Sequence, residues 1–99
     1  MKLKVHKISL LFSWKGLLFG KPKPILFHTR FGIHTFGMKY PIDVVILDKN
    51  LVVRKVKQNL LPNRFFFWNL LLNTVIELPA GTIERKKLKK GVKLQLETF

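Results

Sequence analysis

The stretch from Tyr40 to Asp48 constrains the fold of this 99-residue chain more than any other. Its consecutive β-branched residues Val44, Val45 and Ile46 favour a strand. Pro41 lies at the start of the stretch, where a strand tolerates proline, and the turn sequence Asp48-Lys49-Asn50 closes it. Leu51 to Lys57 then returns from that turn, so the sequence predicts a β-hairpin.

Several other short strands are predicted along the chain. Leu3 and Val5 alternate with lysine and histidine, which is the period of a half-buried strand. Arg64 to Asn73 is apolar almost all round, so a buried strand and an irregular or helical cover both fit it. The expected strands are 2–11, 25–27, 40–48, 51–57, 74–78 and 92–97. Turns about every ten residues predict an all-β fold, a small sandwich or barrel formed by a single domain over residues 1–99.

One short helix is predicted between Thr82 and Lys90. Thr82 is a residue type that caps helices, and Glu84 favours the positive end of the helix dipole. Gly91 is suited to close the helix, because glycine readily adopts the left-handed conformation found after helix ends.

The charge balance of the chain is strongly basic. Nineteen Lys and Arg stand against five Asp and Glu, for a net charge of +14, which favours a polyanion such as nucleic acid as partner. Fifteen of the cations are lysines, which suits loose electrostatic attraction better than base reading. A solubility coat is the alternative interpretation. The candidate nucleic-acid contacts form the densest cluster: Arg85, Lys86, Lys87, Lys89, Lys90 and Lys93.

Asp43 stands inside the apolar hairpin strand and requires an explanation. Side chains alternate along a strand, so Asp43 points to the same side as Val45 and Leu47. A buried carboxylate needs hydrogen-bond donors, and those expected precede it: the amides of the bend at Gly37, the Thr35 hydroxyl and the His34 ring. Asp43 is then either a structural latch for this bend or part of a ligand pocket. The pocket candidates are His34, Thr35, Met38, Asp43 and Glu77.

Glu77 lies opposite the face that Ile76 and Leu78 share. One interpretation is an exposed strand carboxylate beside a lysine, and the other is an acid–base partner of Asp43. The second would define a small carboxylate-based enzyme, but two carboxylates of unknown separation do not establish one. We therefore expect no catalytic residue.

No metal or cofactor is expected either. The chain has no cysteine, and its three histidines lack the spacing of a recognised metal site. The absence of cysteine also excludes disulfides and fits a reducing compartment.

Three phenylalanines and a tryptophan follow Arg64. The pleat of a strand would force some of these rings outward, and a contiguous exposed apolar patch marks a contact surface. The interface candidates, for self-association or for a protein partner, are Phe65, Phe66, Phe67 and Trp68. The alternative is that these rings belong to the core.

Three motifs together resemble the family known as domain of unknown function 192 (DUF192). They are Lys15-Gly16-Leu17-Leu18, HTFGMKYPIDVVILD from His34 to Asp48, and IELPAGT from Ile76 to Thr82, followed by Gly91. The resemblance implies a compact, mainly β domain of the jelly-roll-like sandwich type, and it implies no activity because the family has no settled one. Where the family typically places an aspartate after the late glycine, this chain has Val92, so no role of that carboxylate transfers.

The N-terminal stretch has a basic start and an apolar run. Ser13 to Gly16 interrupts the run, and no small-residue cleavage site follows. No stretch approaches the ~20 apolar residues of a membrane span. The sequence thus predicts a cytoplasmic, non-catalytic module that binds a ligand or partner, with a nonspecific nucleic-acid binder and a small enzyme as alternatives.

Overall fold

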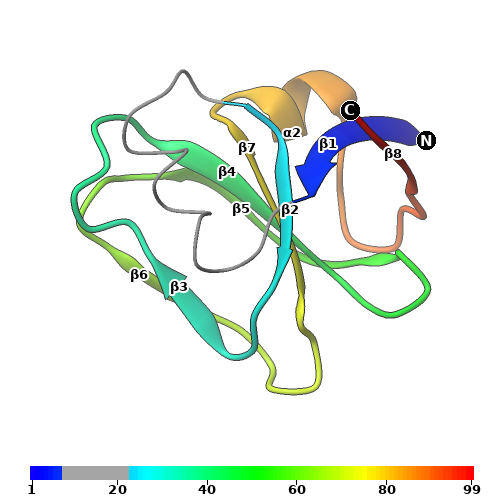
Figure 1. The fold of residues 1–99 in the computed structure, drawn as a ribbon, viewed down its shortest axis with the longest axis horizontal. Coiled ribbons are helices and arrows are strands. Elements are labelled where there is room, and N and C mark those ends of the chain that lie inside the picture. Colours follow the sequence, from blue (N-terminus) through cyan, green and yellow to red (C-terminus); the bar gives the residue numbers. More distant parts are fainter. Residues whose placement is uncertain (8–22) are drawn as a thin grey trace.

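The computed structural model describes residues 1–7 and 23–99 of the chain (Figure 1). The elements are β1 (Lys2–Lys7), β2 (Ile25–His28), β3 (Gly32–His34), β4 (Ile42–Leu47), β5 (Val53–Leu60), β6 (Phe65–Phe67), β7 (Thr74–Pro79), α2 (Thr82–Lys86) and β8 (Gln95–Thr98). A six-stranded sheet has the order β5-β4-β7-β2-β1-β8, and β3 pairs with β6 in a separate two-stranded sheet. The predicted all-β class with one short helix is confirmed, but the larger sheet does not close into a barrel.

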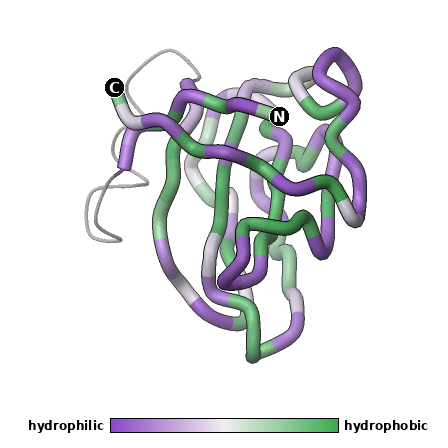
Figure 2. The backbone as a smooth tube through the Cα atoms, turned by 90° about the vertical axis from the view of Figure 1, so that its right-hand side faces the viewer, coloured by the Kyte–Doolittle hydropathy of each residue, from purple (hydrophilic) through white to green (hydrophobic). Residues whose placement is uncertain are grey.

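The larger sheet is mixed. The neighbouring pairs among β5, β4, β7 and β2 are antiparallel, whereas β1 runs parallel to both β2 and β8. The predicted hairpin is confirmed as β4 and β5, and the predicted alternation of β1 appears in Figure 2 as a repeated change between hydrophobic and hydrophilic colours. The Lys15-Gly16-Leu17-Leu18 motif lies outside the described residues.

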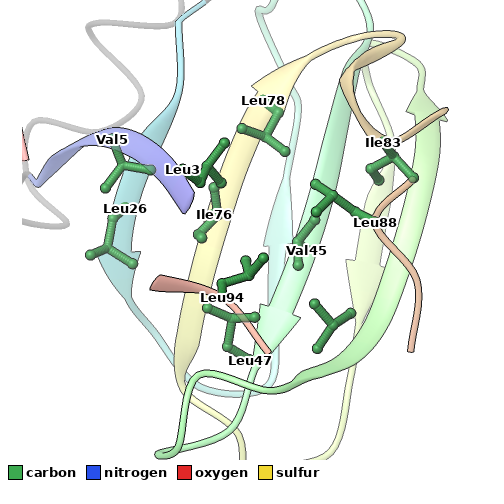
Figure 3. Close-up of a cluster of buried hydrophobic side chains, with 11 residues drawn as sticks. Leu3, Val5, Leu26, Val45, Leu47, Ile76, Leu78, Ile83, Leu88 and Leu94 are labelled. Carbon is green, nitrogen blue, oxygen red and sulfur yellow. The ribbon is translucent and has the colours of Figure 1, made fainter. Parts of the chain in front are cut away.

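Strand β4 lies between two hydrophobic clusters and contributes residues to both. All of its residues are buried, because the sheet is covered on both faces. Val45 and Leu47 join the first cluster, which includes residues of β1, α2 and the segment before β8 (Figure 3). Ile42 and Val44 join the second cluster, on the opposite face. The predicted division of β4 into two faces is confirmed.

The β3–β6 sheet covers the second cluster. Its inward residues Ile33 and Phe66 pack against this cluster, to which Met38 and Trp68 also belong. Figure 1 shows β3 and β6 side by side, at the end of the molecule away from the chain termini and β8. This sheet was not anticipated, since its strands have only three residues each and β3 begins at a glycine.

Helix α2 is shorter than predicted. It ends at Lys86, because Lys87 adopts the left-handed conformation (φ 56°) four residues before Gly91. Its N-cap is Gly81 rather than Thr82, whose hydroxyl instead donates a hydrogen bond to the carbonyl of Pro79 at 2.7 Å. Among the described residues, no helix has the length and apolar character needed to cross a membrane.

Candidate binding surface

The Asp43 carboxylate is fully buried and accepts three hydrogen bonds from backbone amides. Oδ1 accepts from Asn59 at 2.9 Å, and Oδ2 accepts from Gly81 at 3.0 Å and from Ile83 at 2.9 Å. Asn59 and Gly81 both have a positive φ. The carboxylate therefore fixes two sites of unusual backbone conformation, one near the end of β5 and one in the turn before α2. Asp43 thereby ties β4 to the end of β5 and to the start of α2.

Asp43 therefore faces inward as predicted, but the prediction of its donors was wrong. All three donors follow Asp43 in the chain, and none belongs to the bend at Gly37. The physical reason is the pleat of β4. It turns Asp43 toward the first cluster, whereas Met38, next to Gly37 in the bend, packs in the second cluster on the other face of the sheet.

Thr35 and His34 have other partners. The Thr35 hydroxyl donates to the carbonyl of Leu61 at 2.7 Å and accepts from the amide of Arg64 at 2.9 Å, so this buried residue fastens the loop that leads into β6. His34 is exposed, and its Nδ1 accepts from the amide of Phe36 at 3.3 Å. Neither residue is a hydrogen-bond partner of Asp43.

Glu77 lies on the opposite face of the sheet from Asp43. In the pairing of β4 with β7, Glu77 is the partner of Val44, and Asp43 is the partner of Leu78. The structure thus does not bring the two carboxylates together. Glu77 is only 5% exposed, so the interpretation as an exposed strand carboxylate was wrong.

Burial perturbs the chemistry of Glu77. It raises the pKa of the carboxyl group to about 8. Within the described ranges, no group donates a hydrogen bond to its Oε2. Tyr40 lies within the electrostatic influence of Glu77, and burial, followed by the charge of Glu77, raises the pKa of the Tyr40 phenol.

The basic segment, Arg85 to Lys93, is a solvated surface. Its six predicted nucleic-acid contacts are all exposed. On neighbouring β5, Lys55 and Lys57 pair with residues of β4 that face the second cluster, so they lie on the β3–β6 side of the sheet. The basic segment and these two lysines therefore lie on opposite faces of the sheet.

An exposed row of rings follows the outer side of the β3–β6 sheet. The pleat of β6 directs Phe66 inward and leaves Phe65 and Phe67 outward, 59% and 49% exposed. The ring centroids are 5.7 Å apart for Phe65 and Phe67, 5.2 Å for Phe67 and Phe31, and 4.9 Å for Phe65 and Phe36. We call Phe31, Phe67, Phe65 and Phe36 the aromatic row.

The sequence anticipated only part of this row. Outward rings were predicted for the Phe65 to Trp68 stretch, but Trp68 is buried in the second cluster, and its Nε1 donates to the carbonyl of Leu72 at 2.8 Å. Phe31 and Phe36 were not anticipated. In the sequence, these two phenylalanines flank Gly32 to Thr35. This pattern indicates exposed rings beside β6 only once β3 is known to pair with β6.

Gly32 makes room for the row. It is the β3 partner of Phe67, and a Cβ atom at this position would lie 2.5 Å from Cδ1 of Phe67 and 2.8 Å from the carbonyl oxygen of Phe66. The second of these atoms belongs to the backbone, so rotation of a side chain would not relieve the clash.

We expect Gly32→Ala to lower the free energy of unfolding by about 1–3 kcal/mol, since the two strands would have to separate. Urea denaturation measures the loss. His34→Ala is the matched control, because it also places an alanine in β3, at an exposed position, and should change stability little. Equal midpoints for Gly32→Ala and the wild type would contradict the close approach of Phe67.

Cations border the aromatic row. Lys55 Nζ donates to the carbonyl of Phe67 at 3.0 Å and lies 5.1 Å from the ring centroid of Phe66. A pocket of about 210 Å³ adjoins the row and is lined by Lys57, Asn59, Leu60, Leu61, Arg64 and Phe65. The sequence contains no Asp or Glu between Asp48 and Glu77, so the whole of β5 and β6 lacks acidic side chains.

The open mixed sheet with its small second sheet places the chain among mainly β domains. The family model of DUF192, described as an uncharacterized ACR, matches residues 13–96, and the chain belongs to this family. The predicted resemblance is confirmed.

Two solved structures share the fold. A protein from Sinorhizobium meliloti, described as a "putative transcription regulator", has a TM-score of 0.76 at 18% identity over 88% of this chain and 76% of its own. A protein of unknown function from Novosphingobium aromaticivorans has a TM-score of 0.73 at 17% identity over 90% of this chain and 70% of its own. A search of the curated proteins found no match.

Proposed function

We propose that this chain is a non-catalytic module that binds nucleic acid through the aromatic row and the cations beside it. The observation that carries the proposal is the exposed line of four phenylalanine rings, bordered by Lys55, Lys57 and Arg64. Exposed rings stack on nucleobases, and lysine and arginine neutralise phosphates. Monomeric proteins seldom leave so many neighbouring rings in water without a contact to make.

The carboxylates support a non-catalytic role. Asp43 is sealed from solvent, and its two oxygen atoms already accept three amide hydrogen bonds. Glu77 lies on the other face of the sheet, so the two groups cannot act as acid and base on one substrate.

The basic segment has a secondary part in this proposal. Its exposed cations add to the net charge of +14 and thus to long-range attraction of a polyanion. Ile83 and Leu88 belong to the first cluster, so the basic segment lies on that side of the sheet. The aromatic row lies on the opposite side.

Fluorescence anisotropy with a short labelled oligothymidylate, recorded across a salt titration, tests the proposal. We expect the double variant Phe65→Ser/Phe67→Ser to lose about tenfold or more in affinity, since each stacked ring contributes about 1–3 kcal/mol. Phe99→Ser is the matched control. It removes a ring that is 68% exposed at the C-terminus, where it stacks on His6, and should leave binding unchanged.

Lys89→Gln/Lys90→Gln distinguishes the basic segment from the aromatic row. We expect this pair to weaken binding only slightly at physiological salt. If it abolishes binding while the double phenylalanine variant binds normally, the ligand is held by the basic segment and the proposed surface is wrong. Absence of binding by the wild type, even at low salt, would overturn the proposed function.

A further inference from the structure

We infer that the preferred ligand is a single strand, with bases stacked along the aromatic row and a backbone phosphate in the pocket between Lys57 and Arg64. The inference rests on the proposed function and specifies its ligand.

The pocket is suited to one phosphate and its sugar. Its volume of about 210 Å³ is below the roughly 300–1,000 Å³ of sites that enclose whole drug-sized ligands. Two cations, Lys57 and Arg64, contribute to its wall, and Phe65 of the aromatic row forms another part. A phosphate held there would be linked directly to a base placed on the Phe65 ring.

Buried polar residues hold the walls of this pocket from two sides. Asp43 fixes Asn59 through the 2.9 Å hydrogen bond from its amide. The Thr35 hydroxyl fixes Leu61 by donating to its carbonyl, and it fixes Arg64 by accepting from its amide. The pocket is therefore preorganised, which lowers the entropic cost of binding.

The charge around the pocket is uncompensated. Within residues 1–7 and 23–99, the ion pairs join Lys2 to Glu97 and Arg54 to Asp48, and neither involves Lys57 or Arg64. Among partners in the described part of the chain, the Arg64 guanidinium donates only to the neighbouring carbonyl of Asn63, at 3.3 Å. Both cations thus remain available to an anionic group.

The row itself favours single strands over duplexes. Its four members are phenylalanines, which present ring surface and no hydrogen-bonding group with which to read base edges in a groove. In a duplex the bases stack on one another, so that their faces are closed to a protein, whereas in a single strand they can turn onto aromatic side chains. A duplex would contact the cations but not the rings.

Three probes of equal length separate these contributions: oligothymidylate, an abasic strand with the same number of phosphates, and a duplex. We expect the wild type to bind oligothymidylate about tenfold or more tightly than the abasic strand, because stacking is lost with the bases. Phe65→Ser/Phe67→Ser should remove this difference, leaving similar affinities for the two strands.

Lys57→Gln tests the phosphate pocket. We expect it to weaken the binding of both single-stranded probes by a similar factor. The slope of log affinity against log salt concentration should fall by about one, because one phosphate contact is lost. Lys89→Gln is the matched control on the basic segment. An unchanged affinity and salt slope in Lys57→Gln would overturn the pocket assignment.

The failure of this inference is distinguishable from failure of the proposed function. If all three probes bind the wild type equally and the phenylalanine variant weakens all of them, the proposed function holds and the preference for single strands is wrong. If the phenylalanine variant binds as the wild type does, the proposed surface is wrong as well. If none binds at low salt, both fail. In that case, light scattering that reveals a dimer disrupted by Phe65→Ser/Phe67→Ser would identify the row as a contact between copies, and binding to phosphatidylserine vesicles would identify a lipid surface.

Discussion

Replacing Asp43 with alanine should lower the free energy of unfolding by about 3–5 kcal/mol, the largest loss we expect from a single substitution in this chain. The variant would leave the amides of Asn59, Gly81 and Ile83 without the acceptor that they share, and that of Ile83 is buried. Each unsatisfied buried amide is costly, and hydrogen bonds to a charged acceptor are stronger than those between neutral groups. Urea denaturation followed by circular dichroism measures the change.

Two further variants sharpen this test. Asp43→Asn keeps one acceptor oxygen but places an NH₂ group against amide donors, so its stability should fall between that of Asp43→Ala and that of the wild type. Asp48→Ala is the control on the same strand-and-turn unit. Asp48 also accepts from two backbone amides, those of Asn50 and Val52, but it lies at the surface, where water can replace it. An Asp43→Ala protein as stable as Asp48→Ala would disprove the latch.

Stability should fall as the pH rises from about 5 to about 8, because burial raises the pKa of Glu77 to about 8 from its ordinary value of 4.5. Between these two values the folded chain retains a proton that the unfolded chain has released. Unfolding then releases a proton, and each pH unit lowers the free energy of unfolding by on the order of 1 kcal/mol. The stabilisation is complete below the unfolded pKa and is lost as the pH passes the folded pKa.

Glu77→Gln should flatten this dependence, since the amide mimics the protonated acid and does not titrate. Denaturation curves of the variant and the wild type at several pH values, subtracted from each other, isolate the contribution of Glu77 from those of other groups. The pKa of Asp48 is lowered in the folded protein, so its contribution to the free energy of unfolding is lost only as the pH falls below about 4. Asp48 therefore does not affect the slope between about pH 5 and about pH 8. Glu84→Gln, on the exposed surface of α2, should leave the slope unchanged. Parallel pH profiles for Glu77→Gln and the wild type would show that Glu77 is ionised in the folded protein.

The strands with strong local signals were predicted well. Consecutive β-branched residues identify β4, a turn sequence identifies its hairpin with β5, and strict alternation identifies β1. In each case the signal lies within the strand or its adjoining turn, so no knowledge of distant segments is needed. The outward rings of β6 follow from the same alternation, once a strand is assumed there.

The β3–β6 sheet could not be predicted in this way. Three residues are too few for a period to be visible, and the two strands are separated by the whole β4–β5 hairpin. Neither strand is stable alone, and they exist because Ile33 and Phe66 are buried against the second cluster. The aromatic row, and with it the proposed binding surface, depends on that pairing.

The amino-acid sequence by itself determined the class of fold and the face of β4 to which Asp43 points, because these follow from local composition and a period of two. Its motifs also carried the resemblance to the family. Only the tertiary structure decided what covers each face. The donors at Gly81 and Ile83 come from 38 and 40 residues beyond Asp43, and the burial of Glu77 depends on packing across the sheet. Such contacts arise from the folded arrangement of distant segments, and alternation along one strand carries no information about them.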